Sequence, residues 1–212
     1  MNIRGAIFDL DGTLTDSMYI WQKAPVDLVR RYGGDPPEDL ARDLKEMGRR
    51  EAAEYLRDRF ALSATPEELM DTLNDLVTEE YRSRVPMKPG ADQLLARLAD
   101  SGISCCIATA SEAFQARSAM ERLGLWQHFR FAVSCVQYGG KTRPDIYLEA
   151  ARRLGTAPGE TVVFEDALHA ARTAHEAGFR VCGVWDTSAQ EDQAALKALA
   201  DWYVRDLGDW EP

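Results

Sequence analysis

The sequence contains few of the residues that bind zinc or form structural disulfides. Its 212 residues include four cysteines and three histidines. No two cysteines form a C-x-x-C pair, and no group of cysteines and histidines has the spacing of a zinc site. Each cysteine lies in or beside an apolar run, so we expect buried, reduced thiols in a protein of a reducing compartment. The four are Cys105, Cys106, Cys135 and Cys182.

Positive charge and long apolar runs are also scarce. The chain has 25 lysines and arginines against 35 aspartates and glutamates, a formal net charge of −10. This acidity argues against nucleic acid or an anionic membrane surface as the main partner. No run of about 18 apolar residues predicts a membrane-spanning helix, and the N-terminus lacks the regions of a signal peptide. We therefore expect a cytoplasmic protein that binds neither nucleic acid nor membrane. A monomer or weak homodimer is also expected, although no residue pattern argues for either.

Short apolar runs and helical spacings alternate along most of the chain. The first apolar run, residues 3–10, stops at Asp-Gly and predicts a strand followed by a turn. Further strands are predicted at residues 103–109, 131–136, 161–165, 180–185 and 202–204. Helices are predicted near residues 91–101, 113–123, 145–154, 168–177 and 189–199. This alternation indicates an α/β fold with a doubly wound, Rossmann-like parallel sheet.

One stretch departs from this alternation. Between residues 17 and 81 apolar residues recur at helical spacing, and we expect no strand there. Thr65, followed by Pro66 and two glutamates, predicts a helix start. The expected organisation is an α/β core domain of residues 1–15 and 86–212, with a small all-helical cap domain, residues 16–85, inserted between its parts.

Two carboxylates, Asp9 and Asp11, stand where the first predicted strand gives way to a turn. If the chain is still extended there, both side chains lie on the same face. Close carboxylates repel each other, so the pair needs a cation, a shared proton or hydrogen bonds. Gly12 permits a tight turn and Thr13 supplies a hydroxyl. Taken alone, this segment is equally consistent with a solvated acidic turn.

Polar residues also follow the next three predicted strands. They are Thr109, Ala110 and Ser111 after the second strand, Lys141 after the third, and Glu165 with Asp166 at the end of the fourth. Each segment alone has an ordinary explanation as a helix cap or a solvated charge. In a parallel sheet, however, such residues gather at the carboxyl edge. Together they supply oxygen ligands for Mg²⁺, a cation for phosphate and an oxygen nucleophile.

Four motifs in this order resemble those of the haloacid dehalogenase superfamily. They are D-L-D-G-T at residues 9–13, Thr109, Lys141, and the pair Glu165 and Asp166. The resemblance covers essentially the whole chain, and it points to the branch of phosphatases and β-phosphoglucomutases that carry a small helical cap.

The resemblance implies a two-step phosphoryl transfer. Asp9 would attack the phosphorus and form an aspartyl-phosphate. Asp11 would protonate the leaving oxygen and then deprotonate the attacking water. Thr109 and Lys141, with local N–H groups such as that of Ala110, would hold the phosphoryl oxygens.

The resemblance also implies Mg²⁺ as the cofactor. The ion would lie between Asp9, the backbone carbonyl of Asp11 and Asp166, with Glu165 close by. This is physically sensible, because phosphoryl transfer depends on positioning and charge neutralisation more than on elaborate covalent chemistry.

The sequence departs from the family pattern near two motifs. Ala167 and Ala170 stand where the family usually has serine and glycine, and Thr142 and Arg143 follow the third-motif lysine where proline is usual. His169 is therefore expected near the catalytic mouth, either as a surface residue at a helix start or as a contact to substrate or water.

The retained Asp11 favours phosphate esters, because branches that dehalogenate or cleave carbon–phosphorus bonds replace it. We therefore expect a phosphatase of a small-molecule phosphate ester. One alternative is a β-phosphoglucomutase-like mutase. Residues 17–22 lack that family's cap histidine, and Glu112 and Ala113 replace its Lys-Asn pair. Arg49 loosely matches a cap arginine that binds the distal phosphate in mutases. The sequence is equally consistent with an ordinary solvent-exposed arginine on a helix at this position.

The other alternative is a non-catalytic regulator that binds a phospholigand. The intact acid/base Asp11 argues against it, since a sensor does not need that group. The cap is expected to set specificity, and Tyr19, Trp21, Met47 and Arg49 are candidates for its lining. The sequence does not name the ester.

Overall fold

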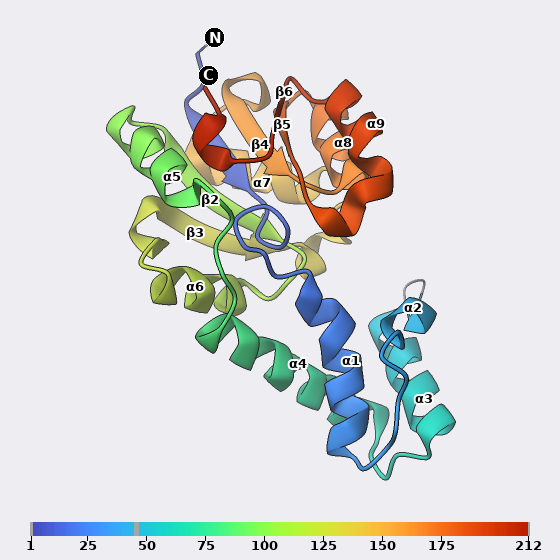
Figure 1. Ribbon diagram of the computed structural model, residues 1–212. Coiled ribbons are helices and arrows are strands. Elements are labelled where there is room, and N and C mark those ends of the chain that lie inside the picture. Colours follow the sequence, from blue (N-terminus) through green and yellow to red (C-terminus); the bar gives the residue numbers. More distant parts are fainter. Residues whose placement is uncertain (1, 45–46, 212) are drawn as a thin grey trace. The chain divides into compact units, whose positions relative to one another are not determined.

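The computed structural model describes residues 2–44 and 47–211, which form two compact units (Figure 1). The first, called the core unit, comprises Met1–Asp16 and Val85–Pro212, and the second, called the helical unit, comprises Ser17–Arg84. Four residues within the predicted domain ranges lie outside the described residues: Met1, Lys45, Glu46 and Pro212.

A six-stranded sheet forms the centre of the core unit, with strand order β3-β2-β1-β4-β5-β6 and every neighbouring pair parallel. The strands are β1 (Gly5–Phe8), β2 (Ser104–Thr109), β3 (Phe129–Ser134), β4 (Thr161–Glu165), β5 (Arg180–Val184) and β6 (Trp202–Val204). The central β1 pairs with β2 on one side and β4 on the other, so that Phe8 lies opposite Ile107 and Phe164. The predicted doubly wound α/β fold is confirmed.

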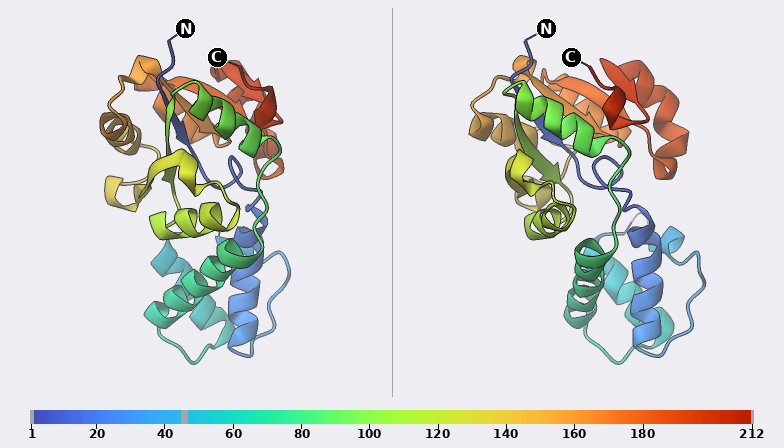
Figure 2. Two further views of the ribbon diagram at one scale, coloured as in Figure 1. Left: turned by 90° about the vertical axis from the view of Figure 1, so that its left-hand side faces the viewer. Right: turned by 60° about the vertical axis from the view of Figure 1, so that its left-hand side comes forward.

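Helices cover both faces of this sheet (Figure 2). The core-unit helices are α5 (Ala91–Asp100), α6 (Ala113–Arg122), α7 (Asp145–Leu154), α8 (Leu168–Glu176) and α9 (Gln193–Leu199). Short 3₁₀ turns are η1 (Trp126–His128), η2 (Cys135–Tyr138), η3 (Pro158–Glu160), η4 (Thr187–Asp192) and η5 (Leu207–Asp209). Helix α7 packs against β1, β2 and β3, and α8 against β4 and β5.

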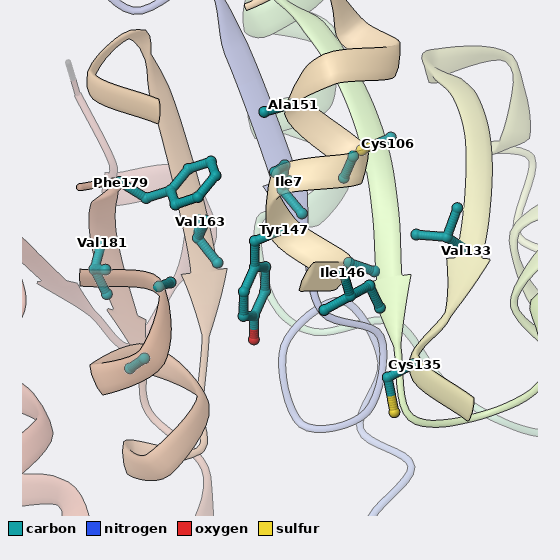
Figure 3. Close-up of a cluster of buried hydrophobic side chains, with 14 of the residues drawn as sticks. Ile7, Cys106, Val133, Cys135, Ile146, Tyr147, Ala151, Val163, Phe179 and Val181 are labelled. Atoms are coloured by element: carbon teal, nitrogen blue, oxygen red, sulfur yellow. The ribbon is translucent and has the colours of Figure 1, made fainter. Parts of the chain in front are cut away.

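The face under α7 and α8 holds a cluster of buried apolar side chains (Figure 3). Successive strand residues point to opposite faces, so β1 contributes Ile7 to this cluster and Phe8 to the other face. Tyr147 enters the cluster from α7, and Val163 from β4. On the other face Phe8 stacks on Phe164 with ring centroids 4.4 Å apart. The strands are therefore held from both sides, which fixes where their carboxyl ends lie.

Several predicted boundaries were wrong; the first strand, for example, spans Gly5–Phe8 rather than residues 3–10. The third strand ends at Ser134 rather than at residue 136, because the chain turns into η2 there. The Ser134 side chain accepts the Val136 N–H at 3.4 Å, and Gly139 ends the turn in the left-handed region at φ 75°. The last helix begins at Gln193 rather than near residue 189, since the 3₁₀ turn η4 precedes it.

The helical unit contains four helices in its described part, residues 17–44 and 47–84, and no strand. They are α1 (Tyr19–Arg31), α2 (Ala41–Leu44), α3 (Arg49–Phe60) and α4 (Pro66–Ser83). Thr65 caps α4 as predicted: its hydroxyl accepts the Glu68 N–H, and Glu68 accepts the Thr65 N–H in return. Helix α4 packs against α1 and α3 around a separate apolar cluster that includes Leu28, Leu56 and Leu69.

All four cysteines are free and buried, as expected. In the part of the chain that the structure describes, no helix is both long enough and apolar enough to cross a membrane.

Candidate active site

The carboxyl end of β1 is the point at which the order of the sheet reverses. The chain continues from β1 to β2 on one side and reaches β4 on the other only after β3. In open α/β sheets such a switch point leaves a crevice beyond the strand ends, where ligands bind. Asp9 directly follows β1, and its backbone N–H donates to the Phe164 carbonyl at 3.0 Å. The first predicted catalytic residue therefore lies at this point, beside the end of β4.

The loop after Asp9 closes tightly on itself. The N–H groups of Leu14 and Thr15 both donate to the Leu10 carbonyl, and the Thr15 hydroxyl donates to it at 2.9 Å. Gly12 lies in the left-handed region at φ +83°, and a Cβ on it would lie 2.4 Å from Asp166 Oδ2. Only glycine therefore permits this turn to approach the end of β4 so closely.

Three buried carboxylates converge beyond β1 and β4. Asp9, Glu165 and Asp166 each offer an oxygen, and these atoms lie within 4.8 Å of one another. The Thr13 hydroxyl donates to Asp166 Oδ1 at 3.2 Å. Hard carboxylate oxygens are the ligands that Mg²⁺ prefers, so the donor set fits the predicted cofactor. The Asp11 side chain does not belong to this cluster, and its predicted metal contact was through its backbone carbonyl.

Lys141 lies inside the same acidic group. Its ammonium donates to Asp9 Oδ1 and to Glu165 Oε1, and the lysine is buried. The two carboxylates outweigh the effect of burial and raise the pKa of Lys141 well above its usual value. The lysine is therefore a fixed cation beside Asp9.

The pKa values of Asp9 and Asp166 are raised. Burial raises the pKa of Asp9 well above its usual value; Lys141 opposes this rise, and Glu165 and Asp166 add to it. Burial, followed by the charge of Glu165, raises the pKa of Asp166 to about 7. One lysine cannot neutralise this many buried carboxylates, so the cluster favours a further cation.

Asp11 is held on the other side of the loop, toward β2. The Ser111 hydroxyl donates to Asp11 Oδ2 at 2.7 Å, and the Ser111 N–H donates to Thr109 Oγ1 at 2.9 Å. Ser111 and Thr109 are both buried. Since Thr109 Oγ1 accepts from the backbone, its own hydroxyl proton can be donated to a bound oxygen. The sequence analysis placed Ser111 after the second strand but assigned it no role, and the structure shows that its hydroxyl contacts Asp11.

Several of the candidate residues named from the sequence are not in this buried group. Ala110 is exposed beside Thr109, where its role would be that of its backbone. His169 is exposed in the first turn of α8. Arg49 is exposed at the start of α3, in the helical unit. The predicted role of Arg49 in substrate binding remains a prediction.

The sequence analysis also missed a buried ion pair at the neighbouring strand end. Lys88 Nζ donates to Asp186 Oδ2 and to the Trp185 carbonyl, both at 2.9 Å. Ser188 donates to the other oxygen of Asp186 through its N–H and its hydroxyl. The Lys88 backbone N–H also donates to the Leu14 carbonyl at 2.9 Å. This pair therefore connects the end of β5 to the loop that carries Asp9.

A buried nucleophile candidate, a lysine and an acidic cluster at the switch point define a hydrolase of the haloacid dehalogenase type. The model of the haloacid dehalogenase-like hydrolase family matches residues 6–184, and the chain belongs to this family. Among curated relatives, the phosphorylated carbohydrates phosphatase of Thermotoga maritima is 28% identical over 93% of this chain and 92% of its own length.

Hexitol phosphatase A of Escherichia coli is 32% identical over 87% of this chain and 84% of its own length. Among solved structures, a candidate β-phosphoglucomutase from Thermotoga maritima has a TM-score of 0.83 and 26% identity, over 98% of this chain and 96% of that one. The predicted enzyme class, a phosphoric monoester hydrolase, agrees with the names of the curated relatives.

Proposed function

We propose that the protein is a Mg²⁺-dependent phosphatase that hydrolyses small-molecule phosphate monoesters through an aspartyl-phosphate on Asp9. The observation that carries this proposal is the buried contact of Lys141 with Asp9, beside an acidic cluster at the switch point of the sheet. A nucleophile, a fixed cation and hard oxygen ligands are the parts that phosphoryl transfer to a carboxylate requires.

In the first step an oxygen of Asp9 attacks the phosphorus and the bond to the ester oxygen breaks. Asp11 donates a proton to that leaving oxygen, so that an alcohol departs. The Ser111 hydroxyl contact supports this role, because it orients the Asp11 carboxyl. In the second step Asp11 takes a proton from water, which attacks the phosphorus and releases Asp9 and inorganic phosphate.

Lys141 and Thr109 hold the phosphoryl oxygens during both steps. Lys141 provides its charge as a point cation, and Thr109 provides a hydroxyl proton. Asp9, Asp166 and Glu165, with the Asp11 backbone carbonyl, are the residues that would hold the metal ion. When bound, Mg²⁺ supplies positive charge to the transferring phosphoryl group and to the crowded carboxylates.

Sugar and sugar-alcohol phosphates are the substrate class that the relatives favour. The two curated relatives described above are named as phosphatases of phosphorylated carbohydrates and of a hexitol. We propose that the helical unit selects among such esters, with Arg49 and the exposed Tyr19 and Trp21 as candidate contacts.

The test is a screen of phosphate monoesters with purified protein, with and without Mg²⁺. Release of inorganic phosphate that requires Mg²⁺ and disappears in the Asp9→Asn variant is the expected result. If no ester of a broad panel is hydrolysed, the phosphatase proposal is wrong. If β-glucose 1-phosphate is isomerised without release of phosphate, the mutase alternative replaces it.

A further inference from the structure

Tyr147 belongs to the apolar core and to the candidate site at once. It lies on α7 and is almost fully buried, and its ring packs near Phe179 with centroids 6.2 Å apart. Figure 3 shows the ring among the apolar side chains, with the hydroxyl oxygen directed toward the carboxyl ends of the strands. A phenylalanine would fill the same space in the cluster, so packing alone does not require the hydroxyl.

The hydroxyl has a specific partner at the site. It donates to Glu165 Oε1 at 3.0 Å, and this same oxygen accepts from the Lys141 ammonium. Glu165 is completely buried, and Lys141 also contacts Asp9. A continuous chain of buried polar contacts therefore runs from the Tyr147 hydroxyl through Glu165 and Lys141 to Asp9.

The hydrogen bond from the Tyr147 hydroxyl restricts how the Glu165 carboxylate can rotate. The other carboxylates of the cluster, Asp9 and Asp166, have oxygens within 4.8 Å of a Glu165 oxygen. A cation among these groups would attract both Glu165 oxygens. Because Tyr147 and Lys141 share Oε1, rotation of Glu165 away from Lys141 breaks two buried hydrogen bonds at once, which is costly.

We propose that Tyr147 is a positioning residue that, through Glu165, holds Lys141 in place against Asp9 and the transferring phosphoryl group. This inference rests on the proposed function, since it assigns Lys141 to the phosphoryl oxygens. Tyr147 does not touch substrate. By holding the Glu165 carboxylate in one orientation, Tyr147 keeps the Lys141 ammonium from moving. Small displacements of such a charge-neutralising group reduce the rate strongly.

The test compares Tyr147→Phe with a matched variant, Tyr203→Phe. Tyr203 lies on the edge strand β6 of the same unit, and its hydroxyl donates to Gln193 Oε1 at 2.6 Å. Both variants remove one phenolic hydrogen bond and keep the ring. Glu165→Gln and the double variant Tyr147→Phe/Glu165→Gln complete a cycle that measures whether Tyr147 acts through Glu165.

Three quantities are measured: kcat and KM for the best ester of the screen, the binding of inorganic phosphate in excess Mg²⁺, and the binding of Mg²⁺ alone. We expect Tyr147→Phe to lower kcat about tenfold, with a smaller change in KM. Phosphate binding should weaken about threefold or more, and Mg²⁺ binding should weaken less than phosphate binding, because Glu165 keeps its carboxylate. Tyr203→Phe should match the wild type in all three, and the double variant should be no slower than Glu165→Gln.

Phosphate binding needs no turnover, so it separates this inference from the proposed function. If no ester is hydrolysed but Tyr147→Phe still weakens phosphate binding, the result supports the positioning role of Tyr147 and shows that the phosphatase proposal is wrong. Wild-type kcat and phosphate binding in Tyr147→Phe would overturn the inference. Additive losses in the double variant, or equal losses of Mg²⁺ and phosphate binding, would also overturn it, because Tyr147 would then not act on Lys141 through Glu165.

Discussion

The Ser111 hydroxyl donates to Asp11 Oδ2 at 2.7 Å, across 100 residues of sequence. The bond joins the end of β2 to the loop after β1. The contact selects one orientation of the Asp11 carboxyl, and the proposed acid depends on it.

Replacing Ser111 by alanine should therefore slow the hydrolysis of esters with poor leaving groups. We expect kcat/KM for a sugar phosphate to fall about tenfold, which is part of the roughly 10²–10⁴-fold that general acid catalysis supplies, because Asp11 itself is retained. The value for p-nitrophenyl phosphate should change much less, because its leaving group needs no proton. The control is Ser188→Ala, which removes a hydroxyl that donates to Asp186 at 2.6 Å. Equal losses for both esters in Ser111→Ala would contradict the account.

Gly12→Ala tests the close approach of the catalytic loop to Asp166. A Cβ at residue 12 would lie 2.4 Å from Asp166 Oδ2, and the backbone there has φ +83°. The carboxylate must move, so we expect Mg²⁺ binding, measured by calorimetry, to weaken about tenfold or more. Gly102→Ala is the matched control, because Gly102 has φ +71° but nothing within 4 Å of the new Cβ. Both variants carry backbone strain of about 1–2 kcal/mol; only the first should lose affinity for Mg²⁺.

The binding of Mg²⁺ should depend on pH. In the metal-free protein the pKa of Asp166 is about 7, whereas an unfolded aspartate has a pKa of about 3.9. Between these values the native carboxyl keeps its proton and the unfolded one has lost it. The contribution of Asp166 to the free energy of unfolding therefore falls as pH rises from about 4 to about 7.

A metal ion requires the ionised carboxylate, so affinity for Mg²⁺ should drop about tenfold per pH unit below pH 7 for each proton displaced. The rise in the melting temperature on adding Mg²⁺ should accordingly be larger at pH 8 than at pH 5.5. The comparison variant is Asp166→Asn, in which Mg²⁺ should produce little shift at either pH. If Mg²⁺ raises the melting temperature of the wild-type protein equally at both pH values, then no carboxyl with a raised pKa loses its proton on binding.

Lys88→Met should destabilise the protein. The lysine and Asp186 are both buried, and removal of one partner leaves a buried charge without compensation. Such losses cost about 3–5 kcal/mol. Urea unfolding should show this decrease, and the double variant Lys88→Met/Asp186→Asn should recover part of it, since the orphaned charge is gone. A double variant as unstable as the sum of the two single variants would argue against a coupled pair.

The architecture was predictable because its signals are local. Apolar runs that stop abruptly at polar residues predicted all six strands, and β4 and β6 have the predicted bounds. The carboxylates and the lysine were placed at strand ends, and parallel strands bring such ends to one edge. The convergence of Asp9, Lys141, Glu165 and Asp166 thus followed from the order of elements.

The finer contacts of the site were not predictable from the sequence. Tyr147 has the spacing of an ordinary core residue of α7, and nothing local shows that its hydroxyl reaches Glu165. The contact between Lys88 and Asp186 spans 98 residues. Such pairings depend on strand register and on side-chain directions, which helical or strand periodicity does not encode.

The central claim is that Asp9 is phosphorylated during turnover. Wild-type protein should be mixed with an excess of the best ester and Mg²⁺, quenched in acid within milliseconds, and digested for mass spectrometry. The account predicts a phosphoryl group on the peptide that contains Asp9, which borohydride reduction converts to homoserine at residue 9, and no label in Asp9→Asn. Turnover without a phosphorylated residue, or a label on any residue other than Asp9, would contradict it.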